Sequence, residues 1–386
     1  MAEDQRLDPV EFRRILLAAP FPAWQWVSIN RYTRNLQRAL AESGYRPAEG
    51  FMPWFNPPSM LYGLRTRYRQ RSAALAAHGR EPFEIVHVTD HALGHHVPSL
   101  GRRAPVVVTC HDLMPFYMPR YYSLPLAPIK KAMITRSIRS MLRADHLVAV
   151  SGATKARMVE ILDIDPARIS VVPNLLRPGL RPIANPREPL AEAGIQLPPG
   201  PIVLSIGHTG HYKNLELLVE SMALPSLRHA TVVRVGARLS SEQRALAATL
   251  GTEARIVELG HVSAATLRAL YSAASVLALP SRDEGFGIPV IEAMACGLPV
   301  VTSDGGALPE VAGKAAIVVP LSGATGCGDD ARLFAEALVA VLDSPERVGE
   351  LRSAGLRRAE MFRAKQVLPL VLHAYREASR AARARL

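Results

Sequence analysis

The sequence contains few cysteines and no long apolar run. Its three cysteines, Cys110, Cys296 and Cys327, have no CxxC spacing, so they offer neither a disulfide framework nor a zinc site. No apolar stretch approaches the ~18 residues that span a bilayer, and no charged start followed by an apolar segment marks a secretory signal. These absences lead us to expect a cytoplasmic protein.

Lysine is scarce, yet the chain is strongly basic. Only six of its 46 basic residues are lysines, and with 34 acidic residues the formal net charge is +12. An excess of positive charge suits nucleic acid, an anionic membrane surface or a phosphate-bearing substrate. Because no nucleic-acid recognition motif accompanies the charge, we predict no nucleic-acid partner.

Short apolar segments alternate with helical patterns along the chain. Strands are expected at 14–20, 85–90, 105–112, 146–151, 169–174, 201–207, 230–236, 255–260, 275–281, 299–304 and 315–321. This alternation is typical of parallel sheets covered by helices on both faces, and 386 residues are enough for two domains. We predict two doubly wound α/β domains, linked by the proline-rich segment 175–201, whose strand ends bring binding loops into a common central cleft.

The stretch EGFGIPVIEAMACG, residues 284–297, predicts a loop that opens a helix. Pro289 suits a first helical position, and Gly297 is a common helix stop. The N–H groups of residues 286–288 then point out of the helix start, where the helix dipole favours an anion. The two loop glycines have no Cβ and allow a ligand to approach the backbone. We predict a phosphate site at this loop.

Two carboxylates, Glu284 and Glu292, flank the loop. A carboxylate does not bind phosphate, so we infer partners with hydroxyl groups at the helix mouth, such as sugar rings on either side of a phosphate. The alternative is a capped helix that carries two surface glutamates, because glycine turns of this kind are common. Judged from this loop alone, the capped helix is the preferred interpretation.

A second loop follows the expected strand at 201–207. The letters HTGHYK join this strand to Asn214, which is expected to cap the next helix. A lysine at such a strand-to-helix junction, here Lys213, is typical of phosphate sites. Two such loops on neighbouring strands would hold one diphosphate between them. The alternative for Lys213 is a solvated residue beside the cap.

Several stretches together resemble a known family. SRDEGFGIPVIEAMACGLPVVTSDGGALPEVAG is similar to the C-terminal signature of retaining glycosyltransferases of the GT-B type, the large family that includes sucrose synthase and the phosphatidylinositol mannosyltransferases. VLSIGHTGHYKNLELLVESM and GHVSAATLRALYSAASVLALPS resemble its donor-domain segments. VVVTCHDLMPFYMP and HLVAVSGATKARMVEILDIDPARISVVPN resemble its acceptor-domain motifs. These stretches cover most of residues 83–320.

The resemblance implies a domain plan of the GT-B fold. Residues 1–180 would form a Rossmann-like acceptor domain, and residues 181–365 a Rossmann-like donor domain that binds the nucleotide sugar. The last helix, residues 366–386, would return to the first domain.

The same resemblance implies roles for single residues. Glu284 would hold hydroxyls of the transferred sugar, Glu292 the ribose, and Lys213 the phosphates. His111 would face the sugar from the other domain and complete a catalytic set with Lys213 and Glu284; without the family context, a capped histidine at a strand end would be preferred. The base would lie near residues 261–263. The donor-binding set is Gly207, His208, Lys213, Asn214, His261, Val262, Glu284, Gly285, Phe286, Gly287, Ile288, Pro289 and Glu292.

Two departures from the family pattern bear on phosphate binding. Many relatives carry an arginine directly after the first donor-strand glycine, where this chain has His208, a weaker and pH-dependent donor. Many also have paired glycines where the first strand meets its helix, and Val27 and Ser28 stand there instead. Side chains at that point would narrow the approach to the donor diphosphate.

The implied chemistry needs no metal and no cofactor. Breaking the bond from the anomeric carbon to phosphate builds negative charge on the departing nucleoside diphosphate, which Lys213 and the helix dipole would stabilise. The resemblance implies front-face attack with retention of the anomeric configuration, in which the leaving phosphate accepts the acceptor's proton.

The sequence gives fewer indications of the acceptor than of the donor. The stretch 125–143 combines apolar residues with a positive cluster that includes Lys130, Lys131, Arg136 and Arg139, as in a helix on an anionic membrane or around a lipid diphosphate. The alternative is a solvated helix face. We expect a hexose, with mannose from GDP-mannose first and a UDP-sugar next, to reach a cell-surface polysaccharide or glycolipid at the inner face of the cell membrane. The rivals are a nucleotide-sugar epimerase and a silent paralogue that scaffolds glycan assembly.

Overall fold

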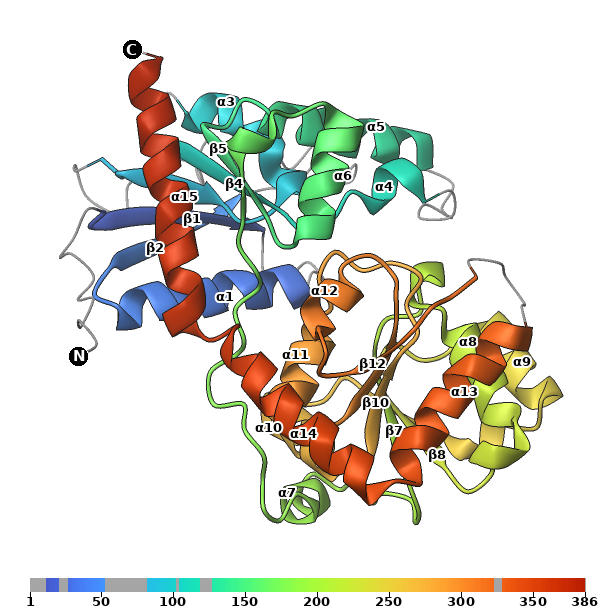
Figure 1. Ribbon diagram of the computed structural model, residues 1–386. Coiled ribbons are helices and arrows are strands. Elements are labelled where there is room, and N and C mark those ends of the chain that lie inside the picture. Colours follow the sequence, from blue (N-terminus) through green and yellow to red (C-terminus); the bar gives the residue numbers. More distant parts are fainter. Residues whose placement is uncertain are drawn as a thin grey trace. The chain divides into compact units, whose positions relative to one another are not determined.

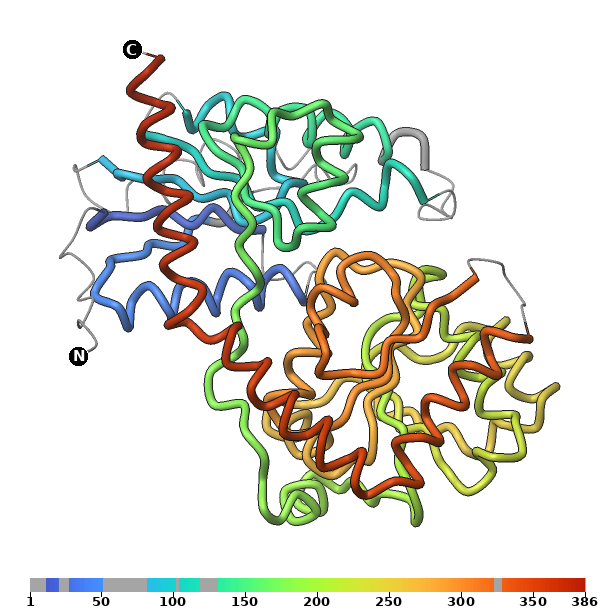
Figure 2. The backbone as a smooth tube through the Cα atoms, viewed as in Figure 1, coloured from blue at the N-terminus to red at the C-terminus, as the bar shows by residue number. Residues whose placement is uncertain are grey.

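The structure is a computed structural model, and its description covers residues 12–20, 27–52, 82–101, 104–118, 127–322 and 328–385. The chain divides into two compact units. The first consists of Met1–Leu175 together with Ala364–Leu386, and the second of Leu176–Arg363. Figure 2 shows the chain leaving the first unit in green and returning to it in red. We had expected the division after residue 180 and the final helix from residue 366.

The first unit is built on a parallel sheet with the strand order β2-β1-β3-β4-β5-β6. Its strands are β1 (Arg14–Pro20), β2 (Arg46–Met52), β3 (Ile85–Val88), β4 (Val106–Cys110), β5 (His146–Ala149) and β6 (Ile169–Val171). No strand was predicted at β2, because its letters RPAEGFM include proline, glycine and glutamate. β2 lies at the edge of the sheet and pairs only with β1, where such residues are tolerated.

Helices cover both faces of this sheet (Figure 1). They are α1 (Val27–Glu42), α3 (Val97–Leu100), α4 (Met114–Tyr117), α5 (Ala127–Met141), α6 (Gly152–Leu162) and α15 (Ala364–Ala384). Successive strand residues point to opposite faces. Val106 and Val108 accordingly belong to the core with α5, whereas Val107 belongs to the core with α1 and α15.

A buried polar network joins α15 to this sheet. His87, on β3, contacts the Tyr375 hydroxyl of α15 through Nδ1 at 2.9 Å and the Thr109 hydroxyl through Nε2 at 2.7 Å. The Tyr32 hydroxyl lies 3.0 Å from the same Thr109 oxygen. Burial, with a smaller effect of His111, lowers the pKa of His87 to about 3. The imidazole is therefore neutral in the folded protein at all ordinary pH values.

We expect the first unit to lose stability as the pH falls below about 6.5, the ordinary pKa of histidine. The folded pKa of His87 is depressed to about 3, so protons bind preferentially to the unfolded chain between these two values. Going from pH 7 to pH 4 then costs about 3 kcal/mol from His87 alone. Thermal unfolding measured against pH should show a weaker pH dependence for His87→Gln. An identical dependence in both proteins would contradict this origin.

The second unit has a parallel sheet with the strand order β12-β11-β10-β7-β8-β9. Its strands are β7 (Ile202–Gly207), β8 (Thr231–Gly236), β9 (Ile256–Gly260), β10 (Val276–Leu279), β11 (Val300–Ser303) and β12 (Ile317–Val319). All six lie within segments predicted from the sequence. The chain order reverses between the neighbouring strands β7 and β10, so the loops after these strands open at the same edge. Ligands bind at such switch points in doubly wound sheets.

Helices of the second unit include one that was not expected. They are α7 (Arg187–Glu192), α8 (Leu215–Ala223), α9 (Ser241–Thr249), α10 (Ala264–Ala273), α11 (Ile288–Ala295), α12 (Leu308–Ala312), α13 (Gly328–Leu342) and α14 (Pro345–Glu360). α7 lies inside the segment 175–201 that we interpreted as a plain linker. Its Leu190 is buried, so part of that segment belongs to the packed unit. In the described part of the chain, none of the helices has the length and apolar character needed to span a bilayer.

Candidate functional site

The loops after β7 and β10 are joined by direct hydrogen bonds. Arg282 N–H donates to the Tyr212 carbonyl at 2.7 Å, and Asn214 Nδ2 donates to the Pro280 carbonyl at 3.1 Å. The predicted side-chain cap by Asn214 is therefore wrong. Asn214 does precede α8, but with a left-handed backbone (φ 52°) and no side-chain bond to the helix, because its amide is used to tie the two loops together.

Lys213 and Glu284 form a buried ion pair across these loops. Nζ of Lys213 lies 2.5 Å from Oε1 of Glu284, and the two side chains are 11% and 10% exposed. The Ser281 hydroxyl donates to the same Oε1 at 2.8 Å. Oε2 of Glu284 makes no hydrogen bond to the described residues. The solvated lysine and the surface glutamate that we kept as alternatives are both wrong.

The Lys213 side chain passes close to Gly207, which has no side chain of its own. A Cβ on Gly207 would lie 3.6 Å from Cε of Lys213, and the backbone of Gly207 has a φ of 132° that other residues rarely adopt. The structure thus brings Gly207, Lys213 and Glu284 together at the carboxyl ends of β7 and β10.

The start of α11 carries the predicted unpaired N–H groups. Gly287 precedes the helix with a φ of 97°, and Pro289 lies in the first turn. The N–H groups of residues 286–288 donate no hydrogen bond within the described ranges. Phe286 is buried against Phe362, with ring centroids 5.6 Å apart. This packing fixes the loop of Gly285, Phe286, Gly287 and Ile288 directly after Glu284.

Glu292 does not face outward at the helix mouth as expected. Its side chain is 2% exposed, the Tyr271 hydroxyl donates to Oε2 at 3.0 Å, and Nε of Arg177 lies 3.7 Å from Oε1. The second turn of α11 therefore contributes an internally paired carboxylate. Sequence reasoning missed Tyr271 and Arg177, which come from distant segments. The role of Glu292 in binding a ribose stays a prediction.

His208 is neutral and bonded within its own loop. The Gly210 N–H donates to Nδ1 at 2.9 Å, which leaves the proton on Nε2, next to the Tyr212 hydroxyl. Desolvation, helped by the positive charge of Lys213, lowers the pKa of His208 to about 4. At neutral pH this ring therefore brings no positive charge to a phosphate.

The expected base-binding residues follow β9. His261 and Ser263 are exposed and Val262 is half-buried, and the Ser263 hydroxyl caps α10 by accepting the Thr266 N–H at 3.1 Å. Among the described residues, the three make no polar contact with Lys213 or Glu284. The role of these three residues in binding a base stays a prediction.

His111 follows β4 in the first unit. Its Nε2 lies 2.9 Å from the Thr89 carbonyl and must donate, so Nδ1 remains an acceptor. The Tyr32 ring packs edge-on against the imidazole at 4.9 Å, and burial lowers the pKa of His111. The ring is thus held in one orientation and one tautomer.

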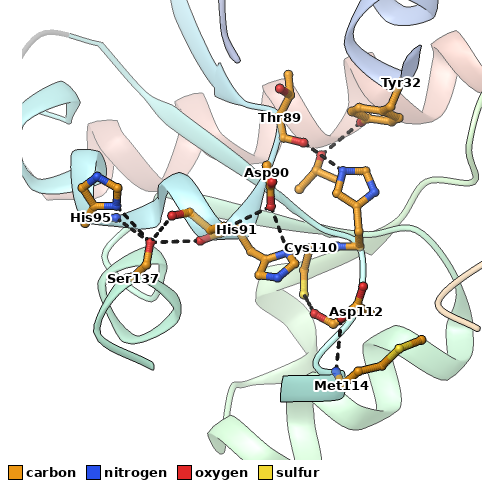
Figure 3. Close-up of polar contacts among 12 residues, drawn as sticks. Tyr32, Thr89, Asp90, His91, His95, Cys110, Asp112, Met114 and Ser137 are labelled. Atoms are coloured by element: carbon orange, nitrogen blue, oxygen red, sulfur yellow. Dashed lines mark hydrogen bonds and ion pairs between the residues drawn. The ribbon is translucent and has the colours of Figure 1, made fainter. Parts of the chain in front are cut away.

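Asp90 and His91, at the end of β3, were missed by the sequence analysis (Figure 3). Oδ1 of Asp90 accepts the Ala92 N–H at 2.9 Å and lies 3.3 Å from Nδ1 of His91. Oδ2 is buried and has no partner in the described ranges. The His111 N–H lies 3.4 Å from the same His91 nitrogen. The signal was available, because the letters TDH directly follow an apolar strand.

The predicted basic surface lies on α5. Lys131, Arg136 and Arg139 are exposed, and they form no ion pair with any described residue. Lys130 has no described side chain, and the same holds for Val27, whereas Ser28 is exposed. No group of three metal-binding side chains occurs among the described residues. Binding to an anionic membrane stays a prediction.

Comparisons with known proteins agree with this architecture. Residues 193–358 match the family described as "Glycosyl transferases group 1", and residues 29–178 match "Glycosyltransferase Family 4". The chain is 30% identical to a D-inositol 3-phosphate glycosyltransferase of Geodermatophilus obscurus over 79% of this chain and 68% of that protein. It is 26% identical to an MMP α-(1→4)-mannosyltransferase of Mycolicibacterium hassiacum, over 80% and 74% of the two chains.

A solved structure shares the fold. Anabaena Alr3699/HepE in complex with UDP and glucose has a TM-score of 0.70 at 16% identity and covers 94% of this chain and 98% of its own. The two parallel-sheet units are thus those of a GT-B glycosyltransferase. The chain belongs to the group 1 glycosyltransferases, which confirms the family and the fold class predicted from the sequence.

Proposed function

We propose that the protein is a retaining glycosyltransferase that moves a hexose from a nucleotide diphosphate sugar to a cell-surface polysaccharide or glycolipid. The observation that carries the proposal is the buried pair of Lys213 and Glu284 beside the unpaired N–H groups at the start of α11. A cation and free N–H groups suit a diphosphate, and an unused carboxylate oxygen suits a sugar hydroxyl. Mannose is our first choice of sugar, since one relative is named a mannosyltransferase.

The same residues account for the chemistry of transfer. The bond between the anomeric carbon and the phosphate oxygen breaks, and the acceptor oxygen forms the new bond on the same face. The acceptor proton passes to the departing phosphate oxygen. Lys213 and the N–H groups of residues 286–288 stabilise the charge that develops on the leaving nucleoside diphosphate. Glu284 holds the sugar through Oε2, and no residue need act as a covalent nucleophile.

The acceptor surface that we propose is the exposed face of α5. Arg136 and Arg139 are one turn apart on this face, while Ile134 and Ile138 are buried on the other. Cations in this arrangement, without an ion pair to the described part of the chain, suit anionic headgroups or a lipid diphosphate. Sedimentation with phosphatidylcholine vesicles, with and without phosphatidylglycerol, tests this: equal absence of binding to both would contradict it.

The function is tested with a panel of UDP-, GDP- and ADP-sugars. We expect one nucleotide family to protect the protein against thermal unfolding, by about 2.7 kcal/mol at a ligand concentration 100 times the Kd. The selected nucleotide sugar is then incubated with lipid and glycan acceptors, and the anomeric configuration of the product is read by NMR. If no nucleotide sugar protects the protein, a silent scaffold is favoured. If the nucleotide sugar is epimerised and no glycoside forms, an epimerase is favoured.

A further inference from the structure

A buried arginine stands directly behind the loop that follows β7. Arg234, on β8, is 2% exposed. Its Nη2 donates to the carbonyls of Gly207 at 2.9 Å and His208 at 3.1 Å. Its Nε donates to the Ala237 carbonyl at 3.0 Å, and Nη1 to the Ser205 hydroxyl at 3.1 Å. Four bonds from one guanidinium thus surround the point where β7 ends.

This arginine has no carboxylate within ion-pair distance in the described part of the chain. Burial lowers the pKa of Arg234 to about 10, with Glu258 opposing the effect, so the group stays charged at neutral pH. Burying a cation costs several kcal/mol unless its hydrogen bonds are satisfied. The backbone oxygens of the loop satisfy them here, which ties the loop's conformation to this one side chain.

The orientation of two peptide groups follows from these bonds. In a trans peptide unit the C=O and the N–H point in opposite directions. Because the Gly207 and His208 carbonyls point at Arg234, the N–H groups of His208 and Thr209 point away from it. Neither N–H donates a hydrogen bond within the described ranges. Two adjacent free N–H groups form a concave site of the kind that binds anions.

Close packing leaves this loop start little freedom. Gly207 pairs with Gly236 on β8, and a Cβ on Gly236 would overlap the Gly207 carbonyl oxygen and lie 3.0 Å from its carbon. The Ala237 N–H also donates to the Gly207 carbonyl at 3.1 Å. The backbone of β8 therefore restrains the Gly207 peptide group, in addition to the hydrogen bonds from the guanidinium.

We propose that Arg234 is a positioning residue, which turns the His208 and Thr209 N–H groups toward the diphosphate of the donor. It acts through the loop and does not touch the ligand. This inference rests on the proposed function, since it assumes that a nucleoside diphosphate binds next to Lys213. His208 brings no positive charge at neutral pH, and its Nε2 lies next to the Tyr212 hydroxyl, so the two peptide N–H groups are the donors of this stretch that have no partner in the described ranges.

The test compares Arg234→Met with Arg255→Met by calorimetry. Arg255 is the control: among the described residues it donates to the backbone carbonyls of Met222, Leu227 and Ala230, much as Arg234 does with three of its four bonds. It directly precedes β9, and so lies at the end of the strands opposite to the loop after β7. The ligands are inorganic pyrophosphate, the nucleoside diphosphate that binds the wild type, and the matching nucleoside.

We expect Arg234→Met to weaken pyrophosphate and nucleoside diphosphate at least tenfold while nucleoside binding stays within twofold. Arg255→Met should leave all three unchanged, and Arg234→Lys should be intermediate, because an ammonium keeps the charge but cannot form the same fork. The proposal would be overturned if Arg234→Met bound the diphosphates as tightly as the wild type does. It would also be overturned if the variant lost as much affinity for the nucleoside as for the diphosphates. A wild-type protein that binds no nucleoside diphosphate would instead refute the proposed function.

A second measurement covers the case in which Arg234→Met does not fold. In wild-type protein labelled with ¹⁵N-threonine, the amide signal of Thr209, assigned with Thr209→Ser, should shift on addition of pyrophosphate and stay in place with the nucleoside. The proposal would be overturned if the Thr209 amide signal did not shift on addition of pyrophosphate although calorimetry showed that pyrophosphate binds.

Discussion

Replacing Lys213 with methionine is expected to lower the rate of sugar transfer about 10²- to 10³-fold, the usual cost of removing one group that stabilises a developing anion. It also leaves the Glu284 carboxylate buried without its cation. Breaking a buried pair on one side costs about 3 kcal/mol or more, so thermal unfolding should occur at a clearly lower temperature. Transfer rates at saturating donor and unfolding curves measure the two effects separately.

The double variant Lys213→Met with Glu284→Gln separates the two consequences. It removes both charges, so most of the lost stability should return, while transfer stays as low as in the single variant or lower. The surface pair of Arg332 and Glu336 is the control, with Nη1 and Oε1 2.7 Å apart and both side chains more than half exposed. Arg332→Met should change stability by less than about 1 kcal/mol and leave transfer unchanged. Normal transfer by either Lys213 variant would contradict the role given to this residue.

Gly306→Ala is expected to destabilise the second unit by about 2–5 kcal/mol and to reduce transfer at least tenfold. Gly306 has a φ of 60°, and a Cβ there would overlap Asp283 Oδ1 and the Glu284 carbonyl oxygen and lie 2.8 Å from the Glu284 nitrogen. The next residue, Ala307, donates its N–H to the same carbonyl at 2.9 Å. A methyl group would therefore push away the backbone that carries the Glu284 carboxylate.

Gly349→Ala is the matched control for this prediction. Gly349 lies in α14 of the same unit, is exposed, and has nothing within 4 Å of the position of an added Cβ. Alanine there should raise stability by up to about 1 kcal/mol, through helix propensity, and leave transfer unchanged. If Gly306→Ala unfolded at the wild-type temperature and transferred sugar at the wild-type rate, the positioning of Glu284 by this glycine would be refuted.

Most of the fold could be predicted from the sequence because a buried strand or a helix start leaves its pattern in consecutive residues. The buried strands of both sheets appear as short apolar runs, and the start of α11 is given by Gly287 and Pro289. The two elements that were not predicted, β2 and α7, lack such a local pattern. The edge strand β2 lacks an apolar pattern, and α7 is a six-residue helix among prolines whose only fully buried residue is Leu190. Neither has a signal that distinguishes it from a loop.

The site was harder to predict because its partners are distant in sequence. Lys213 and Glu284 are 71 residues apart and meet only because β7 and β10 are neighbours in the sheet. Each was selected from its own loop, but no local pattern shows that they pair with each other. The same limit explains the missed bond between Tyr271 and Glu292, 21 residues apart, and the missed role of Arg234, which resembles any other strand residue.

The return of α15 to the first unit sets an order of events during synthesis. Val371, Leu372 and Tyr375 complete a core whose other members include Leu17 and Leu36, so this core stays open on one side until α15 leaves the ribosome. The intervening residues 176–363 contain a whole sheet of their own and can close first. Of the two units, the one whose strands are translated first is thus the last to be completed, and a chain that stops before residue 364 would leave an apolar surface uncovered.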